Sequence, residues 1–236
     1  MTNIKNEFWN ANEAFEYFYK AISKYGVKFA DTRAFFNVGF TILNPTVRII
    51  IDDKRKWNKD YAEAEWQWYL SGDRSISKLG ELYGTVPMIW QRMADNQGNV
   101  NSNYGWKWKR MADGEGNVNS NYGYQWQRND QIGYVIDKIK KDMFTRHACI
   151  SIYDGKEHDK FTHDTPCTYA IQFTNVNNYL NMCVTMRSND LWYGFCNDQY
   201  QFSKLQELIC KETKLDMGTY YHFAHNLHIY NDKLGL

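Results

Sequence analysis

The chain has 236 residues, of which 43% are hydrophobic and 23% are charged. This composition is typical of a globular protein and argues against the disordered, collagen-like and disulfide-scaffold classes. Its 28 basic and 27 acidic side chains leave a net charge of +1, so no overall field favours nucleic acid or a membrane surface as a partner. The length predicts one domain over residues 1–236, in which any anionic ligand is bound by local groups.

No apolar run reaches the roughly 18 residues that span a bilayer, and the polar start of the chain lacks the apolar stretch of a signal peptide. We therefore expect a cytoplasmic protein. The cysteines are odd in number and form no CxxC pair: Cys149, Cys167, Cys183, Cys196 and Cys210. This pattern argues against a disulfide framework and against a thiolate zinc site, so no metal is expected.

Hydrophobic periodicity predicts elements of both kinds along the chain. Helical spacing predicts a first helix from about Asn6 to Ser23, which Gly26 ends, and further helices over 57–70, 131–141 and 198–212. Strand-like runs cover 34–43, 148–153, 168–173, 179–186 and 219–230. The segment from Asn175 to Asn178 is expected to form a hairpin turn. The mixed order of elements favours a layered α/β fold with a mixed sheet.

A tandem duplication interrupts this pattern. Residues 91–108 recur at 109–126, with 13 of 18 positions identical. Two copies are too few for a solenoid, and the unit is rich in Asn and Gly, so we expect an irregular loop over 91–126 lengthened by one insertion. Two aromatic pairs have the same spacing, Trp90 with Tyr104 and Trp108 with Tyr122. Either pair could therefore occupy one ancestral site.

Three places along the chain combine residue types that can carry chemistry. Cys167 follows Pro166 at the start of a predicted strand, which suits a nucleophile, although a small buried hydrophobe is the commoner role of cysteine. Arg187 and Ser188 end another strand and could bind an anion, although a surface ion pair is the commoner role of arginine. Glu65 lies among aromatic residues of a predicted helix, where a solvated glutamate is the commoner outcome.

Three histidines are spaced by three residues, namely His222, His225 and His228. This spacing suits a metal site only on a helix. The Tyr and Phe residues between them favour a strand, so we do not expect them to bind a metal together.

Motifs around these candidates occur in a recognisable order. They are EWQWYLSGD from Glu65, PMIWQRMAD from Pro87, NSNYG around Tyr104 and again around Tyr122, TPCTYAIQF around Cys167, MRSNDLWYGFCND from Met186, and LHIY from Leu227. Over most of its length the chain resembles the thymidylate synthase superfamily, and the run from Met186 is closer to the deoxycytidylate hydroxymethylases of T-even-like phages. The resemblance implies a thymidylate synthase-like fold, in which helices flank a mixed sheet, and a homodimer formed sheet to sheet.

The resemblance also implies a nucleophile. The thiolate of Cys167 would add to carbon 6 of a pyrimidine and activate carbon 5 toward 5,10-methylenetetrahydrofolate, the expected co-substrate. Arg187 and Ser188 would bind the substrate phosphate, and the positive charge of Arg187 would also stabilise the thiolate. Both roles of Arg187 are compatible.

The family lends a pair of adjacent arginines across the dimer to the partner's phosphate site. Arg146 matches the first of them, which implies homodimerisation. His147 stands where the second arginine usually lies, so the strength or pH dependence of phosphate binding is expected to differ. Arg33 is expected to compensate.

Further roles follow from the same resemblance. Glu65 would act as general acid and base through a network over the pyrimidine. The other implied contacts are Asp190 in the base pocket, Trp90 or Trp108 as an aromatic wall for base and folate, Tyr104 or Tyr122 beside the proton network, and His228 with Tyr230 at the sugar 3′-hydroxyl. Burial as ordinary core would equally explain the aromatic residues.

Asp198 is the most informative position, because thymidylate synthases carry asparagine in the equivalent place. An asparagine amide matches uracil, whereas a carboxyl group can accept from the amino group of cytosine and share a proton with its ring nitrogen. The resemblance therefore favours a cytosine base. A role as cap of the helix that follows is the alternative.

These expectations combine into a deoxycytidylate 5-hydroxymethyltransferase that acts in phage nucleotide metabolism. The chain ends six residues after Tyr230, without the long tail that closes thymidylate synthase over its folate, and an open site would admit water to give a hydroxymethyl product. The alternatives are a dCMP methyltransferase, a dUMP-using thymidylate synthase, and a catalytically lapsed nucleotide-binding protein.

Overall fold

The computed structural model describes residues 5–71, 76–87, 131–153 and 167–236. The chain divides into two compact units. The sheet unit comprises residues 1–57, 134–149 and 167–236, and the helical unit comprises residues 58–133 and 150–166. The duplicated segment 91–126 lies outside the described residues. Its loop conformation and the single domain therefore stay predictions.

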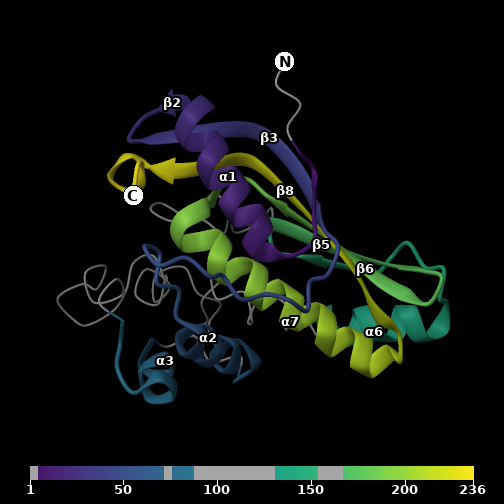
Figure 1. Ribbon diagram of the computed structural model, residues 1–236. Helices are drawn as coiled ribbons and strands as arrows, with labels where there is room; N and C mark the ends of the chain where they lie inside the picture. Colours follow the sequence, from purple (N-terminus) through teal and green to yellow (C-terminus); the bar gives the residue numbers. More distant parts are fainter. Residues whose placement is uncertain (1–4, 72–75, 88–130, 154–166) are drawn as a thin grey trace. The chain divides into compact units, whose positions relative to one another are not determined.

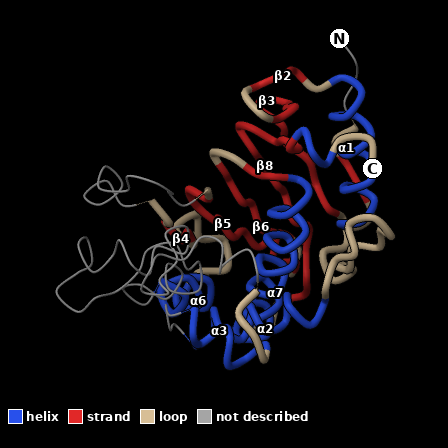
Figure 2. Tube along the Cα trace, turned by 90° about the vertical axis from the view of Figure 1, so that its left-hand side faces the viewer, coloured by secondary structure: helices blue, strands red, loops and turns tan. Residues whose placement is uncertain are grey.

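A mixed β-sheet runs through the sheet unit (Figure 2). The long strand β8 (Asp216–Tyr230) is antiparallel to β3 (Thr32–Ile42) and parallel to β6 (Tyr179–Met186), and β6 is antiparallel to β5 (Thr168–Val176). Two short strands at the edges, β1 (Glu7–Phe8) and β4 (Cys149–Ser151), complete the order β1-β3-β8-β6-β5-β4. Two more short strands lie off this order: β2 (Val27–Phe29) pairs with β3, and β7 (Asn189–Asp190) pairs with β8. The predicted mixed sheet is confirmed.

Two helices pack against this sheet, α1 (Ala11–Tyr25) and α7 (Cys196–Thr213) (Figure 1). The largest fully buried side chains of the unit are Phe8, Phe15, Phe18, Ile22, Phe40, Ile42, Phe173, Phe195, Phe202 and Tyr220. The rings of Phe18 in α1 and Phe40 in β3 lie 4.7 Å apart. Burial of each such side chain contributes about 1.5–3 kcal/mol, so this aromatic core fixes the helices on the sheet.

Helix α1 begins later than the sequence pattern predicts. Asn10 caps it by accepting a hydrogen bond at 2.9 Å from the backbone N–H of Glu13, whose carboxylate in turn accepts from the N–H of Trp9 at 2.7 Å. This reciprocal arrangement satisfies N–H groups that have no partner within the helix. The residues before the cap form β1, which pairs in parallel with the end of β3.

The opposite face of the sheet is only partly covered. Its two central rows are paired across the strands and contain no fully buried residue: Thr41, Tyr221, Cys183 and Gln172 in one row, and Gly39, Phe223, Thr185 and Ala170 in the other. A Cβ atom at Gly39 would lie 2.0 Å from the Tyr221 hydroxyl oxygen. The absence of a side chain at Gly39 thus makes room for the hydroxyl end of Tyr221. We call these two rows the open sheet face.

A π-helical turn, Leu191–Phe195, separates β7 from α7. It adds one residue per turn relative to an α-helix and is frequent at functional sites. Helix α7 follows this turn directly and begins at Cys196, two residues before the predicted start. The predicted strands and helices otherwise match in kind. The elements that the sequence did not predict are β1, β2, β7, the π-helical turn, helix α3 (Ile76–Tyr83) and a short 3-10 helix at Asn231–Lys233.

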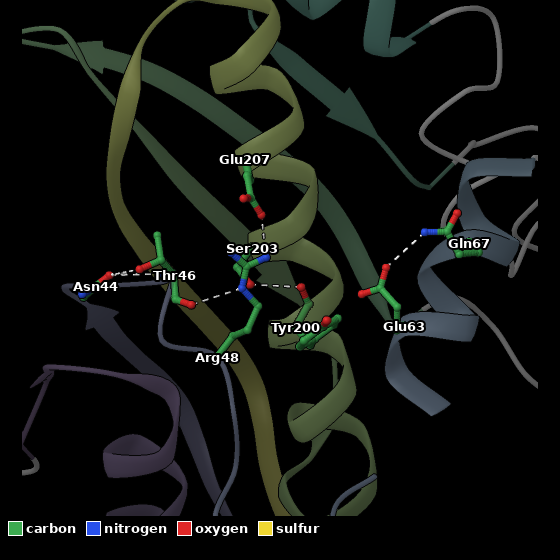
Figure 3. Close-up of polar contacts among 8 residues, drawn as sticks. All are labelled: Asn44, Thr46, Arg48, Glu63, Gln67, Tyr200, Ser203 and Glu207. Carbon is green, nitrogen blue, oxygen red and sulfur yellow. Dashed lines mark hydrogen bonds and ion pairs between the residues drawn. The ribbon is translucent and has the colours of Figure 1, made fainter. Parts of the chain in front are cut away.

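The helical unit contains α2 (Lys59–Ser71) and α3 (Ile76–Tyr83), which pack against each other. The side-chain amide of Asn58 donates to the Tyr83 hydroxyl at 2.9 Å, and Gln67 donates to Glu63 within α2 at 3.1 Å (Figure 3). Helix α6 (Gln131–Lys141), whose residues from 134 onward belong to the sheet unit, has the predicted bounds. Among the described helices, none combines the length and apolar character needed to cross a membrane.

Candidate functional site

Cys167 and Arg187 lie side by side where strands β5 and β6 meet their loops. The backbone N–H of Arg187 donates to the carbonyl oxygen of Cys167 at 2.7 Å, next to the strand pair Thr168 and Met186. Cys167, Arg187 and Ser188 are all partly exposed. The antiparallel register therefore places the predicted nucleophile beside the predicted phosphate-binding residues.

Strand β7 brings Asp190 to the same end of the sheet, opposite His228 in β8. The Asp190 carboxylate accepts hydrogen bonds from the backbone N–H groups of Trp192 at 2.9 Å and Tyr193 at 3.1 Å. Burial raises the pKa of Asp190 from 3.8 to about 6, and these two N–H groups and the charge of Arg55 oppose the rise. A carboxyl group that titrates near neutral pH thus lies at this edge.

Arg55 has no counterpart among the sequence predictions. Its Nε donates to the carbonyl oxygen of Trp192. The loop that carries it is anchored by Arg48, whose Nη1 lies 2.9 Å from Oε2 of Glu207 in α7 (Figure 3). The Arg48 carbonyl also accepts from the Gln199 amide at 2.7 Å. These contacts hold a cation near Asp190, and no local motif in the sequence indicates them.

His228, Tyr230 and Arg33 occupy neighbouring positions on β8 and β3. The rings of His228 and Tyr230 lie 5.4 Å apart, and Arg33 pairs with the residue between them. Burial lowers the pKa of His228, because it disfavours the imidazolium form. The Arg33 guanidinium donates to the carbonyl of Gly26 at 3.4 Å. The structure therefore brings these three predicted substrate contacts to the strand end that also holds Asp190.

Asp198 lies in the first turn of α7, two residues after its start at Cys196. Its Oδ2 accepts a hydrogen bond from the side-chain amide of Asn189 in β7 at 2.7 Å. Gly194 leaves room for this contact, because a Cβ atom there would lie 3.3 Å from the same oxygen. The N-cap residue is Phe195, without a side-chain cap. The alternative in which Asp198 merely caps the helix is therefore wrong, and Asn189 is a neighbour that the sequence reading missed.

Arg146 and His147 are exposed and precede β4. The next residue, Ala148, accepts a hydrogen bond through its carbonyl from the N–H of Phe173 in the middle of β5, at 2.9 Å. Phe173 is six residues along the strand from Cys167. Within one chain these contacts do not bring Arg146 to the nucleophile, and its role toward a partner subunit stays a prediction.

Glu65 belongs to helix α2 of the helical unit. It is buried, and its Oε1 accepts a hydrogen bond from the Tyr61 hydroxyl at 2.9 Å. The other predicted residues of the base and folate contacts lie outside the described residues, namely Trp90, Trp108, Tyr104 and Tyr122. The general acid and base and the aromatic wall therefore stay predictions.

The three spaced histidines lie on β8, in agreement with the strand interpretation. His222 is fully buried with its Nδ1 at 2.8 Å from the Tyr220 hydroxyl, and burial lowers its pKa to about 3. His225 is exposed and contacts Asn37 at 3.0 Å. Over the described part of the chain, no group of three or more His, Cys, Asp or Glu residues could hold a metal ion.

Comparison with known proteins adds three relatives. The chain is 30% identical over 141 residues to the deoxycytidylate 5-hydroxymethyltransferase of Enterobacteria phage T4, covering 60% of this chain and 52% of that protein. It is 37% identical over 111 residues to the deoxyuridylate hydroxymethyltransferase of Bacillus phage SP01, covering 45% of this chain and 28% of that protein. The chain thus spans about half the length of the T4 relative and less of the second.

The fold matches the crystal structure of thymidylate synthase from T4 phage. The TM-score is 0.70 at 23% identity, over 94% of this chain and 77% of that chain. The family model described as thymidylate synthase matches residues 33–235. Since this match covers most of the sequence, the chain belongs to the thymidylate synthase family.

Proposed function

We propose that the protein is a deoxycytidylate 5-hydroxymethyltransferase, which converts dCMP, 5,10-methylenetetrahydrofolate and water into 5-hydroxymethyl-dCMP and tetrahydrofolate. The observation that carries the proposal is the acidic side chain of Asp198, held by Asn189 in the strand that follows Arg187 and Ser188. The similarity to the T4 deoxycytidylate 5-hydroxymethyltransferase supports the same substrate.

The nucleophile in this proposal is Cys167. Its thiolate attacks carbon 6 of the pyrimidine, and carbon 5 gains the electron density needed to attack a one-carbon electrophile. Arg187, whose backbone is hydrogen-bonded to Cys167, pairs with the nucleotide phosphate together with Ser188, because a guanidinium offers a fork of donors to phosphate oxygens. His228 and Tyr230 bind the sugar, and Arg33 adds positive charge at the same strand end.

Asp198 selects the base. One carboxyl oxygen accepts a hydrogen bond from the amino group at carbon 4 of cytosine, and the acid shares a proton with ring nitrogen 3. The carbonyl oxygen of uracil at carbon 4 offers lone pairs instead, so it is repelled by an ionised carboxylate. Asp190 completes the base pocket from β7.

The folate supplies the one-carbon unit. Trp90 or Trp108 is proposed to form the aromatic wall against it, and Glu65, with Tyr104 or Tyr122, to hold the water and protons over the base. Glu65 is suited to this role by its burial and its hydrogen bond from Tyr61, since a carboxyl group of this kind can hold or release a proton next to a reacting group.

A homodimer is part of the proposal. The open sheet face, with Tyr221 exposed and Phe223 half-buried, offers an apolar surface that a second copy would cover, and Arg146 would reach the phosphate site of the partner. Mixing inactive Arg146→Ala and Cys167→Ala chains would then restore about a quarter of the activity, because half of the dimers are mixed and each contains one intact site. A monomer in sedimentation, or no restored activity, would contradict this arrangement.

The function is tested by tritium release from carbon 5 of labelled dCMP and dUMP with methylenetetrahydrofolate present. We expect release from dCMP alone and its loss in Cys167→Ala, with 5-hydroxymethyl-dCMP and tetrahydrofolate as products. Stoichiometric dihydrofolate would indicate methylation instead. Binding of dCMP without any release would favour the catalytically lapsed protein.

A deoxyuridylate hydroxymethyltransferase is the second candidate. It is favoured by the 37% identity to the Bacillus phage SP01 protein over 111 residues. The same assay separates the two substrates, because release mainly from dUMP would overturn the role given to Asp198.

A further inference from the structure

Asn189 is a buried polar residue to which the mechanism gives no task. It lies in β7, where its backbone pairs with Leu227 of β8, and only 2% of it is exposed. Its amide nitrogen donates to Oδ2 of Asp198 at 2.7 Å, while its amide oxygen is buried and has no hydrogen-bond partner among the described residues. The contact to Asp198 therefore determines how this amide is oriented.

We propose that Asn189 is a positioning residue that makes Asp198 selective for cytosine: its amide fixes the plane of the carboxyl group and holds it as a hydrogen-bond acceptor. The inference rests on the proposed function. It assigns specificity to a pair of residues instead of to Asp198 alone.

The chemistry of the pair supports this assignment. An ionised carboxylate only accepts hydrogen bonds, and a donor at one oxygen stabilises the ionised form. With Oδ2 engaged by Asn189, the carboxylate repels the carbonyl oxygen of uracil and accepts from the amino group of cytosine. The shared proton then lies nearer to ring nitrogen 3 than to the acid. A proton in this position also draws electrons from the ring that Cys167 attacks.

The close packing of the turn keeps the pair together. Gly194 follows in the π-helical turn, and a Cβ atom there would lie 3.2 Å from the Asn189 amide nitrogen and 3.3 Å from Oδ2 of Asp198. A larger residue would press on both partners at once. Gly194 thus provides a second, independent way to disturb the contact while both polar side chains stay in place.

Other ionisable groups near Asp198 come from three elements. Burial raises the pKa of the Cys196 thiol in α7 to about 12 and that of Tyr220 in β8 well above 10, so both stay neutral in ordinary buffers. Asp190 in β7, near Arg55, has a pKa of about 6 and does titrate. Asp190 is present in the wild type and in every variant, so a comparison of the variants with the wild type at each pH separates its effect from that of the contact between Asn189 and Asp198.

The test measures the dissociation constants of dCMP and dUMP by calorimetry between pH 5.5 and 8.5, without folate, for the wild type and Asn189→Asp. In this variant two carboxyl groups lie at hydrogen-bonding distance and must share a proton. We expect the preference for dCMP over dUMP at pH 7.5 to fall at least tenfold. We also expect the pH at which this preference changes to rise by one unit or more.

Asn181→Asp is the matched control. Asn181 is another amide of the sheet unit, partly buried where Asn189 is fully buried, and its Oδ1 accepts from the N–H and hydroxyl of Thr219 at 2.8 and 2.9 Å. The acid retains that acceptor and adds the same charge on β6, so the preference should not change. If Asn189→Asp does not fold, Gly194→Ala provides the same measurement and is expected to lower the preference.

The outcomes separate the two proposals. A wild type that binds dUMP as well as dCMP, or better, overturns the proposed function. A wild type that prefers dCMP, with an unchanged preference and pH profile in Asn189→Asp or Gly194→Ala, overturns the role of Asn189 alone. A loss of preference in Asn181→Asp as well would show that added charge, and not the contact, is responsible.

Discussion

Replacing Asp190 with Asn should change how the stability of the protein depends on pH. Burial raises the pKa of this carboxyl group from 3.8 to about 6, so the folded state binds the proton more tightly than the unfolded state. The resulting stabilisation is fully present below pH 3.8 and is lost as the pH rises through about 6. The difference of about two units corresponds to about 3 kcal/mol in full, and to about 1.4 kcal/mol between pH 8 and pH 5.

The assay is urea unfolding of the wild type and Asp190→Asn at several pH values from 5 to 8, followed by tryptophan fluorescence. Asparagine cannot titrate, and it retains one oxygen that can accept from the N–H groups of Trp192 and Tyr193. Any cost of the lost second acceptor is independent of pH. Subtracting the two curves therefore isolates the contribution of Asp190, because all other groups titrate in both proteins.

The expected result is that the wild type gains about 1.4 kcal/mol relative to Asp190→Asn when the pH falls from 8 to 5. A flat difference would mean that the carboxyl group is solvated and has an ordinary pKa. A difference of the opposite sign would mean that the charge of Arg55 and the two backbone donors outweigh burial. Either result would refute the reasoning.

Substitutions at three further places have expected outcomes. Gln206→Leu should lower the free energy of unfolding by about 1–3 kcal/mol in urea titrations. The reason is that the buried amide of Gln206 donates to three backbone carbonyls of β6 and β8, at 2.7, 3.2 and 3.3 Å. An unchanged free energy of unfolding would mean that these carbonyls find other donors. Asn10→Ala should lower the free energy of unfolding by about 1 kcal/mol, because α1 loses its cap, and the loss is measured as a lower melting temperature. Asn10→Asp keeps an acceptor at the cap and should leave the melting temperature nearly unchanged. Of Tyr104→Phe and Tyr122→Phe, one should reduce turnover strongly and the other hardly at all, and equal large losses would contradict the idea that one copy of the duplication is extruded.

Local periodicity was sufficient where an element is long and has one buried face. The strand Tyr179–Met186 and the helix Gln131–Lys141 have the predicted bounds, because alternation and helical spacing directly reflect burial. The predicted hairpin turn is also present but shorter, because Asn175 and Val176 belong to β5. Only Asn177 and Asn178 form the turn, in the left-handed region at φ values of 52° and 71°. Asparagine tolerates this conformation, and two such residues suit a tight hairpin.

Periodicity failed where distant contacts decide. β7 has two residues and exists because Asn189 and Asp190 pair with β8, which no local pattern records. The predicted start of α7 is two residues too late, because the π-helical turn before it has no hydrophobic pattern of its own in the sequence. A short strand and an unusual turn therefore need tertiary information.

The candidate site was predicted mostly through family resemblance. Cys167, Arg187 and Asp190 do lie at one end of the sheet. The residues alone gave Cys167 and Arg187 a commoner structural role, and Asp190 was indicated by the resemblance only. Asn189 escaped notice although it stands inside the quoted motif, because its partner lies nine residues further on, beyond a turn of unknown geometry. Arg55 escaped for a similar reason.

The π-helical turn before α7 is wound more widely than an α-helix, so it holds about one residue more per turn. If one residue were deleted from Leu191–Phe195 and the turn tightened to α-helical winding, the four residues that remain would cover about one turn, as the five do now. Asp198 would then keep its place beside Asn189 of β7. The turn is thus a point at which the chain can lose one residue while the contact between β7 and α7 is preserved.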